Sequence, residues 1–139
     1  HTIFIMSSSN VAFSFDLEIK DDPTDEMVMA AIVKIRTDSA EKDWSVLLTT
    51  SNVPLMAVDR LDGVRQLRVE SVADVVKYCA KVFMYWKAPV FCYNKDYIIG
   101  WLKSKVKELT IDVDVSKFEH HFEEIPRDRS DYRHRSYQL

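Results

Sequence analysis

The strongest constraint on the fold of this chain is the segment Val11–Ile19, in which every second residue is a large apolar one. Successive side chains of a β-strand point to opposite faces of a sheet, so this period of two predicts a strand with one face in a hydrophobic core. The opposite face of the strand would carry Ala12, Ser14, Asp16 and Glu18. A chain with such a strand has to build a sheet around it.

Two more segments that favour strands follow before any helical pattern. The residues Met27–Ile35 are nearly all apolar, which predicts a strand in the interior of the sheet. The segment Trp44–Thr50 is rich in β-branched and aromatic residues and predicts a third strand. The connections between these segments are short and polar, so we expect the three strands to pair antiparallel.

Helical patterns appear only in the second half of the chain. Ser71 and Asp74 have the spacing of a capping box, and apolar residues at helical spacing follow as far as Trp86. A second helix is predicted to begin at a cap formed by Asn94 or Asp96 and to carry an apolar stripe of its own. Each helix is expected to pack its stripe on the sheet.

Two more strands are predicted around the second helix. The apolar run Val90–Tyr93 predicts a short buried strand, and the alternating segment Thr110–Val115 predicts a fifth one. The stretch Ser51–Val69, before the first helix, contains Pro54 and a turn signal and is assigned no element. The expected order is β-β-β-α-β-α-β, an α/β fold with a mixed sheet and helices packed on it. This order is typical of the RNase H-like superfold.

Missing motifs exclude several large classes of enzyme. The chain has 2 glycines, Gly63 and Gly100, so it contains no glycine-rich loop of the kind that cradles phosphates. It also lacks the GxSxG, CxxC and HExxH patterns. Its 2 cysteines, Cys79 and Cys92, lie in apolar stretches and are expected to be buried free thiols of a reducing compartment.

Charge and hydropathy favour an acidic intracellular protein of the cytoplasm or nucleus. The net charge is −3, whereas domains that bind nucleic acid are usually basic. No apolar run approaches the roughly 20 residues of a membrane span, so no membrane contact is expected. We expect one domain at residues 10–117, preceded by a leader or expression remnant at 1–9. A charged tail containing arginine and tyrosine is expected at 118–139.

Asp16 and Glu18 form a candidate metal site, which we call the acid pair. Residues two apart on a strand project side by side, so these carboxylates are placed to share one or two divalent cations. Cleavage of a phosphodiester by two metal ions needs such carboxylates to hold the ions. An equally simple interpretation is that both acids are solvated on the polar face of a half-exposed strand.

The segment that holds the acid pair resembles a known family. Phe15-Asp-Leu-Glu18 is similar to the first motif of the DEDD, or DnaQ-like, 3′–5′ exonucleases, which have the RNase H-like fold. Leu61–Val64 resembles the segment before the first helix of that family, and Pro89–Asn94 resembles the start of its second motif. The resemblance covers residues 11–115. It implies a nuclease that uses Mg²⁺ or Mn²⁺ held by the acid pair.

The later motifs of the family are incomplete in this chain. Aligning Asn94 with the second motif places Ile98 where the resemblance implies the third metal ligand, and Asp96 is the nearest acid. The third motif would supply a general base and a fourth ligand, but neither His120 nor His121 has an aspartate at the required spacing. Loss of a general base lowers rates by about 10²–10⁴-fold. The resemblance therefore implies impaired catalysis.

Three functions stay open at this point. The first is a divergent exonuclease-like domain, impaired in catalysis, that serves as a nucleic-acid-associated or protein-interaction module. The second is an active metal-dependent 3′–5′ exonuclease whose catalytic residues are Asp16, Glu18 and Asp96. The third is an α/β adaptor without a nuclease role, which dimerises or binds a protein partner.

The candidate contacts with a partner are aromatic and basic side chains. Tyr85 falls off the apolar stripe of its helix, and Tyr97 lies near the start of the second helix. Arginine-rich segments such as the tail become ordered on binding RNA. We expect RNA or another single-stranded nucleic acid, a protein partner, or a second copy in a homodimer. The residues expected to contact them are Tyr85, Tyr97, Arg127, Arg129, Arg133 and Arg135.

Overall fold

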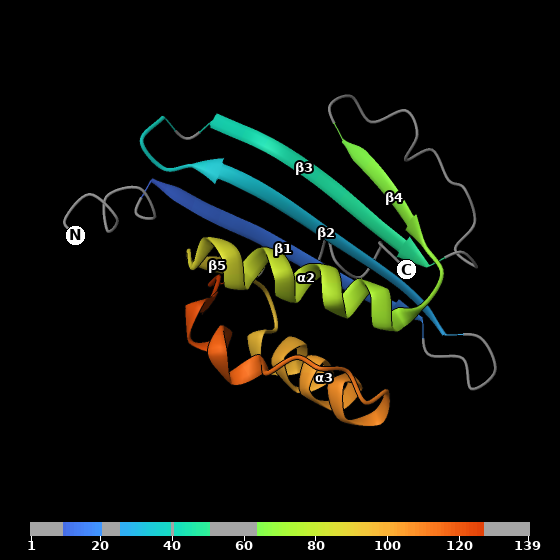
Figure 1. The fold of residues 1–139 in the computed structure, drawn as a ribbon. Coiled ribbons are helices and arrows are strands. Elements are labelled where there is room, and N and C mark those ends of the chain that lie inside the picture. The colour runs from blue at the N-terminus through green and yellow to red at the C-terminus, as the bar shows by residue number, and fades with distance from the viewer. Residues whose placement is uncertain (1–9, 21–25, 40, 51–63, 127–139) are drawn as a thin grey trace.

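The residues that the structure describes fold into a mixed six-stranded β-sheet with two α-helices on one of its faces (Figure 1). The structure is a computed structural model that describes residues 10–20, 26–39, 41–50 and 64–126. The strands lie side by side in the order β4-β3-β2-β1-β5-β6. The predicted α/β class, with helices packed on a mixed sheet, is confirmed.

The first three strands form an antiparallel meander, as predicted. They are β1 (Val11–Lys20), β2 (Met27–Arg36) and β3 (Glu41–Thr50). The apolar strand β2 lies between the other two, so its predicted interior position is confirmed. Strand β3 begins three residues before Trp44, because the chain continues to pair with β2 beyond a register shift at Lys34/Ile35.

A strand that the sequence did not predict lies at one edge of the sheet. This strand is β4 (Arg65–Val69), and it pairs parallel with β3. Its two arginines are exposed, and its other side chains are only half-buried. An edge strand of this kind has neither an alternating pattern nor an apolar run, so it leaves no clear signal in the sequence.

The two helices begin in different ways. Helix α2 (Val72–Trp86) opens with the predicted Ser71 cap, whose hydroxyl accepts a hydrogen bond from the Asp74 amide and donates one to the Asp74 carboxylate. It ends at Lys87, which has a left-handed backbone with φ 51°. Helix α3 (Lys95–Glu108) follows Asn94, whose side chain makes no capping bond.

The strands of the second half run parallel to β1. Strand β5 (Val90–Cys92) pairs with β1, and β6 (Phe122–Glu124) pairs with β5. The predicted burial of the whole β5 segment is wrong at Phe91, which is exposed. Phe91 points away from the helices, to the face that also carries Ser14 of β1.

The fifth strand predicted at residues 110–115 is wrong. Thr110 has a positive φ of 52°, which turns the chain back after α3, and the Ile111 amide donates to the Val106 carbonyl instead of to a strand. The alternation is real, since Ile111 and Val115 are buried, but these side chains anchor a loop on the core. The loop leads into the short helices η2 (Val115–Lys117) and η3 (Glu119–His121) before β6.

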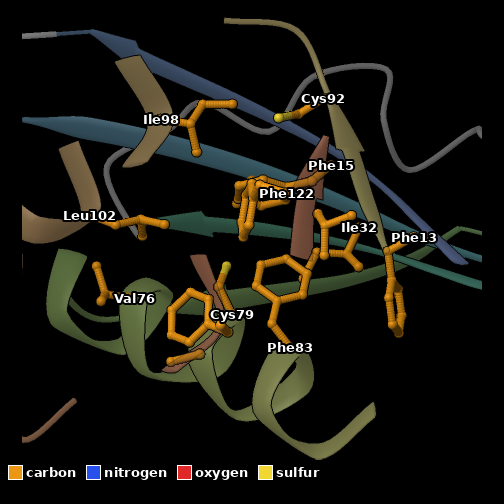
Figure 2. Close-up of a cluster of buried hydrophobic side chains, with 14 of the residues drawn as sticks. Phe13, Phe15, Ile32, Val76, Cys79, Phe83, Cys92, Ile98, Leu102 and Phe122 are labelled. Carbon is orange, nitrogen blue, oxygen red and sulfur yellow. The ribbon is translucent and has the colours of Figure 1, made fainter. Parts of the chain in front are cut away.

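The centre of the core is a cluster of phenylalanines around Phe83 of α2 (Figure 2). The ring centroid of Phe83 lies 5.2 Å from that of Phe15 and 5.3 Å from that of Phe122. The rings of Phe13 and Phe118 lie 6.0 Å away. Residues 118–126 therefore belong to the folded domain, beyond the boundary at residue 117 that composition suggested.

Both cysteines are buried free thiols, as predicted. Burial raises the pKa of Cys79 to about 12, and burial together with the Glu124 carboxylate raises the pKa of Cys92 to about 11. A thiol reacts as its thiolate, so we expect no reaction with Ellman's reagent at mildly alkaline pH until the chain is unfolded in guanidinium. Rapid release of the coloured product from the folded protein would contradict this prediction.

Because the pKa values of both thiols are raised in the folded state, we expect the free energy of unfolding to fall at alkaline pH. Unfolded thiols ionise above pH 8.5 or so, whereas the folded thiols stay neutral. Their contribution to the free energy of unfolding is present below that pH. It is lost as the pH rises towards the folded values of about 11 for Cys92 and about 12 for Cys79.

Candidate functional site on the helix-distal face

Helices α2 and α3 cover one face of the sheet (Figure 1), and the alternation of β1 places the acid pair on the other, here called the helix-distal face. Phe13 and Phe15 of β1 point into the core beneath the helices. Because side chains alternate along a strand, Asp16 and Glu18 point the other way. Asp16 is exposed and Glu18 is half-buried.

The neighbours of the acid pair across the sheet are apolar. Asp16 pairs with Ala31 of β2, and Glu18 pairs with Met29. The same face of β2 carries further apolar side chains, Met27, Val33 and Ile35, all half-buried. Within the part of the chain that the structure describes, no group of three or more His, Cys, Asp or Glu side chains is placed to hold a metal ion.

The structure does not bring Asp96 to the acid pair. Asp96 lies in the first turn of α3, a helix that packs on the opposite face of the sheet (Figure 1), and these three acids form no group that could hold a metal ion. Ile98, at the position where the resemblance implies a third ligand, is buried in the core with Leu102 (Figure 2). Its burial explains why an apolar residue occupies this position.

The cap of α3 comes from a residue far along the chain. Glu124 of β6 accepts hydrogen bonds from the amides of Asn94 and Lys95, each at 2.8 Å. Asn94 occupies the predicted N-cap position, but the expectation that the side chain of Asn94 or Asp96 provides the capping bond is wrong. Asn94 has a left-handed backbone, and its own side chain bonds no amide of the first turn. A carboxylate at this end of a helix also interacts favourably with the helix dipole.

The histidines that the structure describes, His120 and His121, lie in the short helix η3. The rings of His120 and His121 are 4.1 Å apart, and burial, with the charges of His120 and Lys87, lowers the pKa of His121. His120 lines a hollow of about 560 Å³ that also contains Lys103 and Glu119. The Lys103 ammonium and the Glu119 carboxylate pair there at 2.8 Å, so the hollow offers little unbalanced charge.

The aromatic candidates for partner contact lie on the surface of the helices. Tyr85 is 76% exposed and Tyr97 is 58% exposed. Phe83 is buried, and Trp86 and Trp101 are packed against the core. The tail arginines 127, 129, 133 and 135, residues 1–9 and residues 61–63 of the Leu61–Val64 segment lie outside the described residues.

Fold and site together define an α/β protein with a mixed sheet and a helix-distal face on which an acid pair borders apolar side chains. No protein-family model matches the chain, and no curated protein has a significantly similar sequence. No helix among the described residues is long and apolar enough to cross a membrane.

Proposed function

We propose that the chain is a divergent exonuclease-like domain of the RNase H-like fold, impaired in catalysis, that serves as a nucleic-acid-associated or protein-interaction module. Five of the six strands support the fold. They lie in the order β3-β2-β1-β5-β6, antiparallel among the first three and parallel from β1 onwards. The predicted element order gives this arrangement once β6 takes the place of the strand predicted at residues 110–115, and β4 is an added strand at one edge.

The main support for impaired catalysis is that the neighbours of the acid pair across the sheet are apolar. Two-metal cleavage needs enough carboxylates to hold the ions and a base to activate water. Here the residues opposite the two acids are Ala31 and Met29, and no third acid, histidine or cysteine among the described residues joins the pair to hold a metal ion. Two carboxylates beside an apolar strand are better suited to the rim of a binding surface than to metal chemistry.

The test is metal binding and nuclease activity of the wild type against the double variant Asp16→Ala/Glu18→Ala. Calorimetric titration with Mn²⁺ or Mg²⁺ is expected to give the same weak heats for both proteins. Neither protein is expected to cleave RNA or DNA. The single variant Asp112→Ala is a matched control, because Asp112 is an exposed acid outside the sheet.

Magnesium-dependent cleavage that Asp16→Ala abolishes and Asp112→Ala leaves intact would overturn the proposal. It would favour the active exonuclease instead. Tight metal binding that needs both acids, without cleavage, would also count against it, since it would make the pair a true metal centre.

A further inference from the structure

Helix α2 presents a row of basic and apolar side chains to solvent on its outer side. Its buried stripe contains Val75, Val76, Cys79, Ala80 and Phe83. The exposed residues on the other side are Lys77, Lys81, Met84 and Tyr85, here called the α2 ridge. Residues four apart on a helix are neighbours, so Lys77, Lys81 and Tyr85 form one line with steps of about 6 Å.

The charge of the α2 ridge is of one sign. Asp74 is the only acid within α2, and its carboxylate bonds to the Ser71 hydroxyl. Among the described residues, no ion pair involves Lys77, Lys81 or the neighbouring Lys87. The ridge therefore attracts anions, although the whole chain carries a net charge of −3.

The ring of Tyr85 packs on Trp86, which in turn contacts Lys34 of β2 in the sheet. It meets the Trp86 ring edge to face, with centroids 5.2 Å apart and an interplanar angle of 79°. The Lys34 ammonium lies 3.8 Å from the centroid of Trp86 and 2.7 Å from the Asp43 carboxylate. An aromatic ring that is held in place before binding loses less rotamer freedom when a partner covers it.

We infer that the α2 ridge binds an acidic protein segment that carries an apolar anchor residue. Tyrosine and methionine are enriched in protein interfaces, and a tyrosine in a preformed setting is a common hot spot. The anchor packs on Tyr85 and Met84, and the acids of the segment face Lys77 and Lys81. A nucleic acid fits less well, because the chain is acidic overall and the ridge offers few cations. The inference does not depend on the acid pair.

The experiment is a selection of random linear peptides displayed on phage, with the full chain as bait. The expected binders are rich in Asp and Glu around one aromatic or aliphatic residue. Their affinity, measured by fluorescence anisotropy, is expected to fall about thirtyfold or more in Tyr85→Ala, the size of a hot-spot loss. It is expected to stay within a few-fold in Tyr85→Phe, which keeps the ring.

The charge of the ridge is tested separately. The double variant Lys77→Gln/Lys81→Gln is expected to weaken the same peptides by about two- to tenfold, and added salt should have a similar effect. Lys107→Gln on α3 and Leu109→Ala at its C-cap are matched controls, because both residues are exposed. Tyr85 is largely exposed, so its variants are expected to fold, which circular dichroism checks.

Three results would overturn the inference. One is a selection that yields no binder sensitive to Tyr85→Ala. Another is a set of binders that is neutral or basic. The third is labelled oligouridine that binds more tightly than any selected peptide and loses affinity in Tyr85→Ala, which would make the ridge a surface for single-stranded nucleic acid.

Discussion

Replacing Phe83 by alanine is expected to lower the free energy of unfolding by about 3–5 kcal/mol. The Phe83 ring contacts Phe13 and Phe15 of β1, and Phe118 and Phe122 near the end of the described chain. Its removal opens a cavity where α2, the sheet and the C-terminal segment meet. A domain has only about 5–15 kcal/mol of stability, so we expect the variant to be close to unfolding.

Urea unfolding followed by circular dichroism measures this effect. The matched control is Phe91→Ala, because Phe91 is an exposed phenylalanine on β5. We expect that control to cost less than about 1 kcal/mol. Equal losses in the two variants would show that the ring cluster around Phe83 is not the centre of the core.

Replacing Asp43 by alanine is expected to cost about 1–3 kcal/mol, whereas replacing Lys34 by methionine is expected to be nearly neutral. Lys34 is only 8% exposed, and its ammonium pairs with Asp43 at 2.7 Å beneath the Trp86 ring. Loss of Asp43 leaves a buried cation without its carboxylate. Methionine removes the cation and keeps the volume, and the Asp43 carboxylate that loses its partner is partly solvated, so no buried charge is left unpaired. The Asp43 side chain is 41% exposed, which keeps its loss below that of a fully buried pair.

The same unfolding measurement decides between the two outcomes. Asp38→Ala is the control, since the pair of Asp38 with Arg36 is exposed and long, at 3.4 Å. That change is expected to cost less than about 0.5 kcal/mol. A larger loss in Lys34→Met than in Asp43→Ala would mean that the ammonium stabilises the domain by more than its burial costs.

Much of the fold could be predicted because its signals are local. The alternation of β1, the apolar run of β2 and the capping box of α2 each lie within one element. The predictions that failed did so because the wider fold, and not the local pattern of residues, decides the structure there. The alternating residues 110–115 do bury their apolar side chains, but the positive φ of Thr110 sends them into a loop. Likewise Phe122 of β6 is followed by two exposed acids, so composition alone placed this strand in a tail.

In the candidate site, too, the features set by a local pattern were predicted and those set by contacts between distant segments were not. The common face of Asp16 and Glu18 follows from the period of a strand, so the sequence was sufficient for it. The position of Asp96 depends on which face of the sheet α3 covers, and no local pattern gives that. The cap from Glu124 to the amides of Asn94 and Lys95 was missed for the same reason, since it joins segments about 30 residues apart.

Strand β1 has one neighbour close by in the chain and one far away. A short connection joins it to β2, with which it pairs on one edge. Its other edge pairs with β5, which comes after the whole of α2 in the chain. Closing that long loop costs chain entropy before any parallel hydrogen bond forms. During this interval the meander has an unpaired edge and an uncovered apolar face, both of which favour association with other chains. The topology therefore makes the time before β5 docks the period in which the folding chain is most prone to aggregate.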